Sequence, residues 1–335
     1  MKKVTFVFIF VISLFFFSCK SRNYLIYSTS PIDLKNIDAK FVHDIPYDTL
    51  FTTKFDIFLP NSKNATGLII YIHGGGFTEG DKTAIYKNQG YSGDYPNHIR
   101  HFLKDGIAVA SINYRLITPN DTLGVMKCLK DTKHALQYIR YRAKDFNIRK
   151  EDIVLTGVSA GAGASLWLDV KDDMRDLKDK NPVFHESTRV KGVALIQTQC
   201  TYDLEQWVPL VFRDYGVTWD QFFQPFQSLI FGFYGIKTVE EYNSNHIKEY
   251  RKDVDMLSFF TSDDSEIYAD NTQSPVAPPT NISVAEHHAF HVRAIKEAAD
   301  KAGIKNVCYY GKDPIIYNAP SNETYEDFIE RKINE

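Results

Sequence analysis

Short apolar runs recur along the chain and are separated by stretches with the periodicity of amphipathic helices. Helical spacing marks residues 126–143, and small residues at 160–165 suit a helix lying close to a sheet. Residues 55–59 alternate in polarity like a half-exposed edge strand. Six mostly apolar runs are predicted as buried strands: 67–72, 107–113, 153–156, 193–198, 256–261 and 306–310. This alternation predicts an α/β protein with a doubly wound, mostly parallel sheet.

The amino-terminal segment differs from the rest of the chain. Lys2 and Lys3 precede an almost wholly apolar stretch, which is shorter than the roughly 20 residues of a membrane-spanning helix and predicts a signal peptide over residues 1–18. The site at Cys19 is similar to the cleavage site of bacterial lipoproteins, so we expect a lipid on Cys19, a spacer at 19–38 and a globular domain at 39–335. An uncleaved anchor is the alternative. Both predict an extracytoplasmic protein held at a membrane, in the periplasm or at the cell surface.

Composition narrows the class of protein. With 335 residues, 44% of them hydrophobic and 24% charged, the chain is long enough to bury one large core. The formal net charge is −3, and removal of the signal peptide with its two lysines makes it more negative, which argues against nucleic-acid binding. The remaining cysteines (Cys128, Cys200 and Cys308) are odd in number and lie on predicted core elements, so we expect no disulfide framework and no catalytic thiol.

Ser159 lies in a Gly-Val-Ser-Ala-Gly segment between a predicted strand and a predicted helix. A serine at such a sharp turn is held in a strained backbone conformation that exposes its hydroxyl above the end of the sheet. This pattern is typical of a catalytic nucleophile, although the five residues alone are weak evidence.

A second glycine-rich turn, His-Gly-Gly-Gly-Phe at 73–77, follows the strand predicted at 67–72. Glycine runs at a strand end let backbone N–H groups converge, and the tetrahedral intermediate of acyl transfer needs such donors for its oxyanion. We therefore predict an oxyanion hole formed by Gly75, Gly76 and Ala160. A merely flexible turn is the alternative for an isolated triple glycine.

With both motifs in this order, the chain resembles the α/β-hydrolase family, and within it bacterial esterases of the hormone-sensitive-lipase and carbohydrate-esterase type. The resemblance spans about residues 41–311 and includes the Ser-Ile-Asn-Tyr-Arg-Leu segment at 111–116. It implies that the long insertion at about 202–255 crosses the catalytic end of the sheet as a helical cap. Its many aromatic side chains either shape a substrate pocket or fill the interior of the cap.

In this family an acid follows the serine in the chain, after a strand. The strand predicted at 256–261 leads into Asp263 and Asp264. The resemblance favours Asp264 as the acid, with Asp263 as the fallback. Adjacent carboxylates in a loop are also common as solvated or helix-capping groups.

The position of the base departs from the family, whose histidine follows the last strand, because residues 311–335 contain no histidine. The candidates are His287 and His288, just ahead of a helix predicted to run through Ala302. A helical projection places His288 on the face toward the sheet and His287 at its edge, so we favour His288 over His287. A metal site of His287 and His291 with a carboxylate, or purely structural histidines, are the alternatives.

These features predict a serine esterase in which Ser159 attacks an ester carbonyl, one of the two histidines carries the proton and Asp264 orients it, with no cofactor. By analogy with the family and the location, the expected substrates are polysaccharide esters, such as acetyl or feruloyl decorations, or small-molecule esters. The alternatives are a binding protein on a hydrolase scaffold that has lost catalysis and, with less support, a peptidase.

Overall fold

The computed structural model describes residues 25–87, 94–273, 281–313 and 315–335. The predicted signal peptide, Cys19 and the first part of the spacer lie outside these ranges. Within them, every helix is too short or too polar to cross a lipid bilayer.

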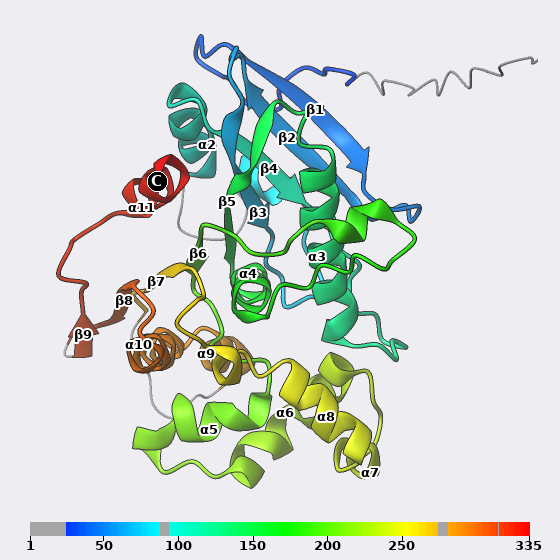
Figure 1. The fold of residues 1–335 in the computed structure, drawn as a ribbon. Helices are drawn as coiled ribbons and strands as arrows, with labels where there is room; N and C mark the ends of the chain where they lie inside the picture. Colours follow the sequence, from blue (N-terminus) through cyan, green and yellow to red (C-terminus); the bar gives the residue numbers. More distant parts are fainter. Residues whose placement is uncertain (1–24, 88–93, 274–280, 314) are drawn as a thin grey trace, which may run out of the picture.

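The described residues form a nine-stranded sheet that runs through the molecule (Figure 1). Its strand order is β1-β2-β4-β3-β5-β6-β7-β8-β9. Six adjacent strands, in the order β4-β3-β5-β6-β7-β8, run parallel to one another. The pairs β1–β2, β2–β4 and β8–β9 are antiparallel. The strands are β1 (Ala39–Pro46), β2 (Lys54–Pro60), β3 (Thr66–Ile72), β4 (Ala108–Ile112), β5 (Ile148–Val158), β6 (Gly192–Ile196), β7 (Glu266–Asn271), β8 (Asn306–Lys312) and β9 (Ile315–Tyr317). The predicted mostly parallel sheet is confirmed.

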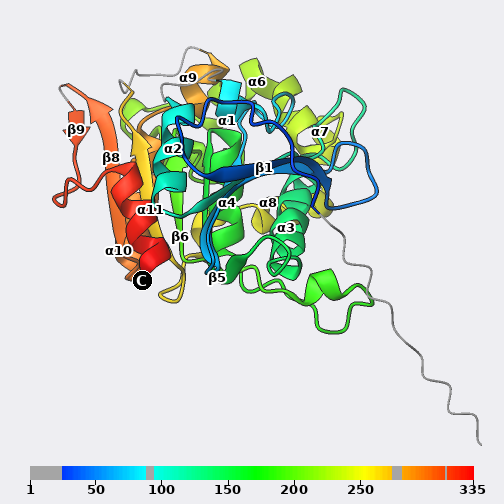
Figure 2. The same cartoon turned by 90° about the horizontal axis from the view of Figure 1, so that it is seen from above.

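Helices cover both faces of the sheet, which explains why its central strands are apolar on both sides. Figures 1 and 2 show α2 and α11 on one face and α3, α4 and α10 on the other. The main helices outside the β6–β7 connection are α1 (Ala84–Lys87), α2 (Tyr95–Lys104), α3 (Val125–Tyr141), α4 (Ala160–Val170), α9 (Ile282–Glu286), α10 (Phe290–Ala302) and α11 (Tyr325–Asn334). Every residue of β3 is buried, as expected for a central parallel strand.

Two hydrophobic clusters lie on the two faces of this sheet. Successive residues of β3 alternate between them: Ile70 and Ile72 belong to one cluster, and Ile69 and Tyr71 to the other. The cysteines at positions 128, 200 and 308 are buried free thiols within the larger cluster. The core therefore holds the parallel strands in place from both sides.

Two strand predictions are wrong. The apolar run at 256–261 contains a 3₁₀ helix, η4 (Met256–Phe259), and the strand comes later, at β7. In β7, Ile267 pairs in register with Val193 of β6. Pairing with β6 therefore stabilises residues 266–271 as a strand, although they are less apolar than the run at 256–261. The strand at 55–59 is not an edge strand, because β1 covers β2 on its outer side.

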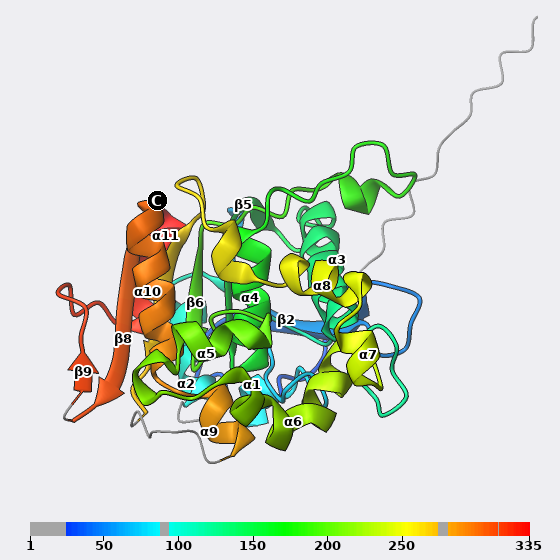
Figure 3. The ribbon, with the colours of Figure 1, turned by 90° about the horizontal axis from the view of Figure 1, so that it is seen from below.

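The connection between β6 and β7 is helical and aromatic-rich, as predicted. Its elements are η2 (Leu204–Gln206), α5 (Trp207–Leu210), η3 (Arg213–Tyr215), α6 (Trp219–Tyr234), α7 (Val239–Tyr242) and α8 (Asn245–Asp253). A capping box at Thr218 starts α6, and Gly235 in a left-handed conformation ends it. Figure 3 shows α6 and α9 at the end of the sheet toward which β8 points. The cap therefore covers the carboxyl ends of the parallel strands.

Asp169, on the last turn of α4, is a buried acid in the core. Its Oδ1 accepts a hydrogen bond of 2.5 Å from the Ser265 hydroxyl, and its Oδ2 has no partner in the described part of the chain. Burial is the main cause that raises the pKa of Asp169 to about 7, and the Asp264 carboxylate adds to this effect.

Asp169→Asn is expected to remove a pH-dependent loss of stability. The pKa of Asp169 is raised from 3.8 in the folded state, so its contribution to stability is complete below about pH 4 and is lost as the pH rises to about 7. The neutral variant should gain free energy of unfolding relative to the wild type over that range, by on the order of 2 to 4 kcal/mol. Urea unfolding of both proteins at pH 4.5, 6 and 8 measures the difference, and a difference independent of pH contradicts the prediction.

Candidate active site

Ser159 occupies the sharp turn between β5 and α4. Its backbone has φ of 53° and ψ of −123°, a left-handed conformation that costs energy in a residue with a side chain. The Ser159 amide donates to the carbonyl of Ile196, at the end of β6, over 2.9 Å. The fold therefore holds this serine in the strained conformation expected of a nucleophile elbow.

Glycines allow the elbow to pack directly against the end of β3. A Cβ atom on Gly161 would lie 2.0 Å from the Ile72 carbonyl oxygen, and one on Gly157 would lie 2.6 Å from the same atom. From the other side, a Cβ on Gly74 would lie 2.7 Å from the Val158 carbonyl oxygen. No larger residue fits at these positions without moving backbone, so the turn and the glycine-rich loop are held at backbone contact.

Three residues beside Ser159 have backbone amides with no acceptor in the described part of the chain. Gly75 and Gly76 have φ of +108° and +57°, which favour glycine. Across the described residues, the amides of Gly75, Gly76 and Ala160 donate no hydrogen bond to another protein group. All three residues line one cavity together with Ser159. This arrangement is consistent with the predicted oxyanion hole.

The glycine-rich loop is fastened at both of its ends. At its start, the Tyr114 hydroxyl donates to the His73 carbonyl over 2.8 Å. Beyond its end, the Lys82 ammonium lies 3.0 Å from the buried carboxylate of Asp56, and the Lys82 amide donates to Asn113. The loop is therefore held in one conformation, as preorganised donors require.

His287 is the histidine that the fold brings to the serine. It forms the C-cap of α9, and its Nε2 lies 2.8 Å from Ser159 Oγ. Its Nδ1 lies 3.0 Å from the Ser283 carbonyl oxygen, which can only accept, so Nδ1 carries a proton and Nε2 can act as an acceptor toward the Ser159 hydroxyl. Burial lowers the pKa of His287, which favours the neutral base.

The preference for His288 is wrong. Its Nε2 lies 3.0 Å from the Tyr215 hydroxyl of the cap, and its Nδ1 accepts from the Phe290 amide. The ring contacts Phe212 and Phe290 edge-on. The helical projection failed because α10 begins only at Phe290, so His287 and His288 lie in a turn and point in different directions.

The assignment of Asp264 as the acid is also wrong, and the fallback, Asp263, is wrong for the same reason. Both precede β7, at its amino end, whereas Ser159 follows the carboxyl end of the parallel strand β5. The two carboxylates each lie 2.8 Å from the guanidinium of Arg189. They therefore form an ion-pair cluster at the amino ends of the parallel strands, whereas Ser159 lies at the carboxyl ends.

Two polar contacts around His287 were not anticipated. The buried side-chain amide of Asn271, at the end of β7, donates to the His287 carbonyl over 3.0 Å. Gln199, which follows β6, donates to the Glu286 carbonyl over 2.9 Å. A correct prediction of β7 would have identified Asn271 as a residue at the end of that strand. The contact with the Ser283 carbonyl could not be predicted, because every residue has a backbone carbonyl and the sequence does not mark which one is used.

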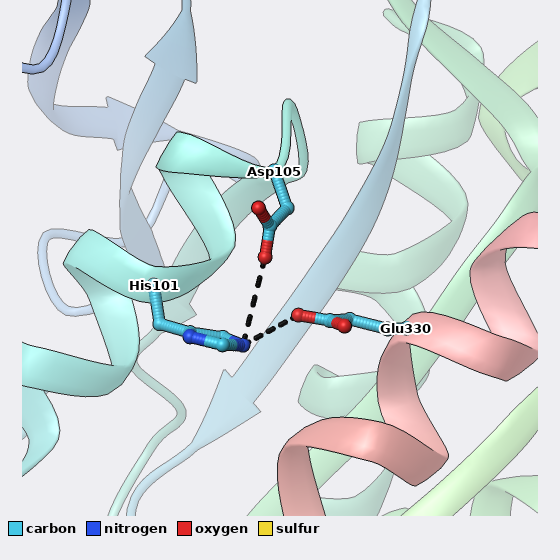
Figure 4. Close-up of side chains that lie close together, drawn as sticks. All are labelled: His101, Asp105 and Glu330. Carbon is cyan, nitrogen blue, oxygen red and sulfur yellow. Dashed lines mark ion pairs between the residues drawn. The ribbon is translucent and has the colours of Figure 1, made fainter.

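The alternative metal site at His287 and His291 is not supported. The two ring nitrogens of His291 bond to the Cys200 amide and to the Ala285 carbonyl, so neither is open to a ligand. Among the described residues, one group of side chains is close enough to hold a metal ion: His101, Asp105 and Glu330, on α2 and α11 (Figure 4). His101 lies 2.5 Å from Glu330 and 3.6 Å from Asp105. These ion pairs join the two helices away from Ser159.

Ser159 and His287 open into a cavity of about 790 Å³. Aromatic side chains of the cap, among them Trp207, Phe222 and Phe233, form much of its wall. Other cap aromatics, such as Trp219 and Phe223, pack against each other inside the cap. The cavity is of a size that fits a ligand much larger than an acetyl group.

Glu286 is a second titratable group in this cavity, one residue before His287. Burial raises the pKa of Glu286 to about 7. Glu286 is thus a carboxyl group directly beside His287 in the sequence. Its partial burial disfavours the ionised form.

Comparisons with known proteins give a family match that covers the glycine-rich loop and the elbow. A model of the BD-FAE family matches residues 55–211, slightly less than half of the chain, and the match includes the glycine-rich loop and the elbow. A search of curated proteins finds no match.

Several solved structures share the fold. A truncated carbohydrate esterase from gut microbiota is 21% identical, with a TM-score of 0.58 and 88% of this chain and 96% of that one covered. The acetyl ester-xyloside bifunctional hydrolase of Caldicellulosiruptor lactoaceticus is 16% identical, with a TM-score of 0.54 and 76% of each chain covered. Esterase 2 of Thermogutta terrifontis is 14% identical, with a TM-score of 0.54 and coverage of 90% and 91%. The chain thus has the α/β-hydrolase fold.

The pH dependence of any reaction at Ser159 should report the lowered pKa of His287. The neutral imidazole is the active base, so a lowered pKa keeps the base available as the pH falls through the ordinary 6.5. We expect kcat/KM for an uncharged nitrophenyl ester, measured from pH 5 to 8, to show an acid-side inflection below 6.5. Glu286→Gln, which removes the other group that titrates near neutrality, should retain this inflection, and an inflection at or above 6.5 in that variant contradicts the assignment.

Proposed function

We propose that the protein is a serine-dependent hydrolase of carboxylic esters. The observation that carries the proposal is the 2.8 Å contact between Ser159 Oγ and His287 Nε2, in a cavity also lined by three residues whose amides bind no acceptor among the described residues. A nucleophile, a neutral base and oxyanion donors within one cavity are the parts that acyl transfer needs.

In the first half-reaction, Ser159 Oγ attacks the ester carbonyl carbon while its proton passes to His287 Nε2. The amides of Gly75, Gly76 and Ala160 bind the negative oxygen of the tetrahedral intermediate. The carbon–oxygen bond to the alcohol then breaks, and the alcohol takes the proton from Nε2. This leaves an acyl group on Ser159.

In the second half-reaction, His287 takes a proton from water, and the resulting hydroxide attacks the acyl carbon. Collapse of this intermediate returns the proton to Ser159 and releases the carboxylic acid. Throughout, the Ser283 carbonyl accepts the Nδ1 proton, which keeps the ring in one orientation and stabilises its charged form. Asp264 has no part in these steps.

For the substrate, we propose an ester of a carbohydrate or of a small molecule. The solved structures that share the fold include a carbohydrate esterase and an acetyl ester-xyloside hydrolase, which supports this class by analogy. The volume and aromatic wall of the cavity would accept a bulky group, such as a feruloyl group or a sugar, beside the reacting carbonyl.

We propose further that the enzyme is a lipoprotein, extracytoplasmic and tethered to a membrane through Cys19. The support is the charged and then apolar segment at residues 1–18, followed by cysteine. Two lysines precede the apolar stretch, as in a secretory signal. This location would place the active site where extracellular polysaccharide esters are available.

Labelling with a fluorophosphonate probe tests the mechanism. Ser159→Ala should abolish labelling, and His287→Ala should slow it by about a thousandfold or more, because the hydroxyl loses its base. Asp264→Asn is the matched control. It should label within about twofold of the wild-type rate, because Asp264 lies at the amino end of β7, away from Ser159, and pairs with Arg189. Circular dichroism confirms that each variant is folded. Wild-type labelling of His287→Ala, or loss of labelling in folded Asp264→Asn, would overturn the mechanism.

The lipid attachment has a separate test. In a bacterial host fed an alkyne fatty acid, the full chain should carry the label and sediment with membranes, whereas Cys19→Ser should lose the label. If the signal is instead an uncleaved anchor, neither protein is labelled and both remain with the membrane. That outcome contradicts lipidation at Cys19.

A further inference from the structure

The cavity that contains Ser159 has an unbalanced set of charges. Two glutamates, Glu79 and Glu286, belong to its wall, and none of its described lining residues is a lysine or an arginine. The two carboxylates differ in setting, because Glu79 is exposed on the glycine-rich loop and Glu286 is partly buried on α9. A negatively charged ligand would therefore find repulsion in this cavity and no cation to offset it.

The backbone of Glu286 is fixed next to the candidate base, and the residue lines the same cavity as Ser159. The next residue, His287, lies 2.8 Å from Ser159, and Gln199 anchors the Glu286 carbonyl. The Glu286 charge also contributes to raising the pKa of Tyr202, whose hydroxyl donates to the Ala160 carbonyl beside the elbow. The field of Glu286 thus reaches the residues that surround the nucleophile.

Among the residues that the structure describes, no cation pairs with the Glu286 carboxylate. Throughout the described chain, no backbone or side-chain donor binds its oxygens, although the α9 backbone around it is hydrogen-bonded. A carboxylate in a partly desolvated setting interacts with nearby charge more strongly than one on the surface. Its oxygens can only accept hydrogen bonds when it is ionised, and hydroxyl groups are suitable donors.

We propose that Glu286 sets the substrate specificity of the site, so that the enzyme takes uncharged, hydroxyl-bearing esters and rejects esters with a negative charge near the scissile bond. This inference rests on the proposed ester hydrolysis. It assigns Glu286 a role in recognition, separate from the proton transfer at His287. The mostly apolar and aromatic remainder of the wall adds no charge that would reverse the selection.

The test compares two nitrophenyl esters that differ in charge: the mono-4-nitrophenyl ester of glutaric acid, which is anionic, and its methyl ester, which is neutral. The readout is the ratio of kcat/KM for the neutral ester to that for the anionic one. Assays at pH 8 keep most of Glu286 ionised, because burial raises the pKa of its carboxyl to about 7. Taking the ratio within each variant cancels general losses of activity.

Glu286→Gln should lower the neutral-to-anionic ratio by about tenfold, because the isosteric amide keeps the shape and removes the charge. Glu79→Gln should lower it by no more than about threefold, since the charge on the exposed loop is screened by water. Glu240→Gln, the same change at an exposed position of the cap outside the cavity, is the matched control and should leave the ratio unchanged.

The possible failures can be told apart. Hydrolysis of the neutral ester with the wild-type ratio retained in Glu286→Gln would overturn the role of Glu286 and leave the esterase proposal intact. A wild-type preference for the anionic ester would do the same. No hydrolysis of either ester, together with no fluorophosphonate labelling of folded wild-type protein, would instead overturn the proposed function and the inference with it.

Discussion

The site depends on the direct contact of two backbones at the carboxyl ends of β3 and β5. Gly157 and Gly161 face the Ile72 carbonyl, and Gly74 faces the Val158 carbonyl, at distances that leave no room for a side chain. This contact places the glycine-rich loop beside the elbow and brings the amides of both segments to one cavity. Because both strands are buried and parallel, the position is defined by the rigid part of the fold.

The proposed proton acceptor comes from a different part of the chain. His287 lies between β7 and α10. Two contacts fix His287 on the side away from Ser159: its Nδ1 faces the Ser283 carbonyl, and the Asn271 side-chain amide donates to the His287 carbonyl. A ring held in this way has a defined tautomer and orientation without Asp264, which the fold uses in an ion pair with Arg189 instead.

The charges of the molecule are divided between the two ends of the sheet. At the amino end of β7, Arg189 balances Asp263 and Asp264. In the cavity at the carboxyl end, none of the described lining residues supplies such a cation to Glu286, and burial raises the pKa of its carboxyl. The cap thus does more than line the cavity, because it also contributes to the electrostatic environment in which Ser159 and His287 would act.

The sequence by itself determined the elements with strong local signals: the central apolar strands, α3, the cap segment, and the two glycine-rich turns that surround Ser159. These follow from periodicity and backbone conformation, which act over a few residues. Only the tertiary structure decided the position of β7, the choice of His287 over His288 and the removal of Asp264 from the site. These depend on strand register and on the exact start of α10, because pairing with a distant strand outweighs the local apolar pattern at 256–261.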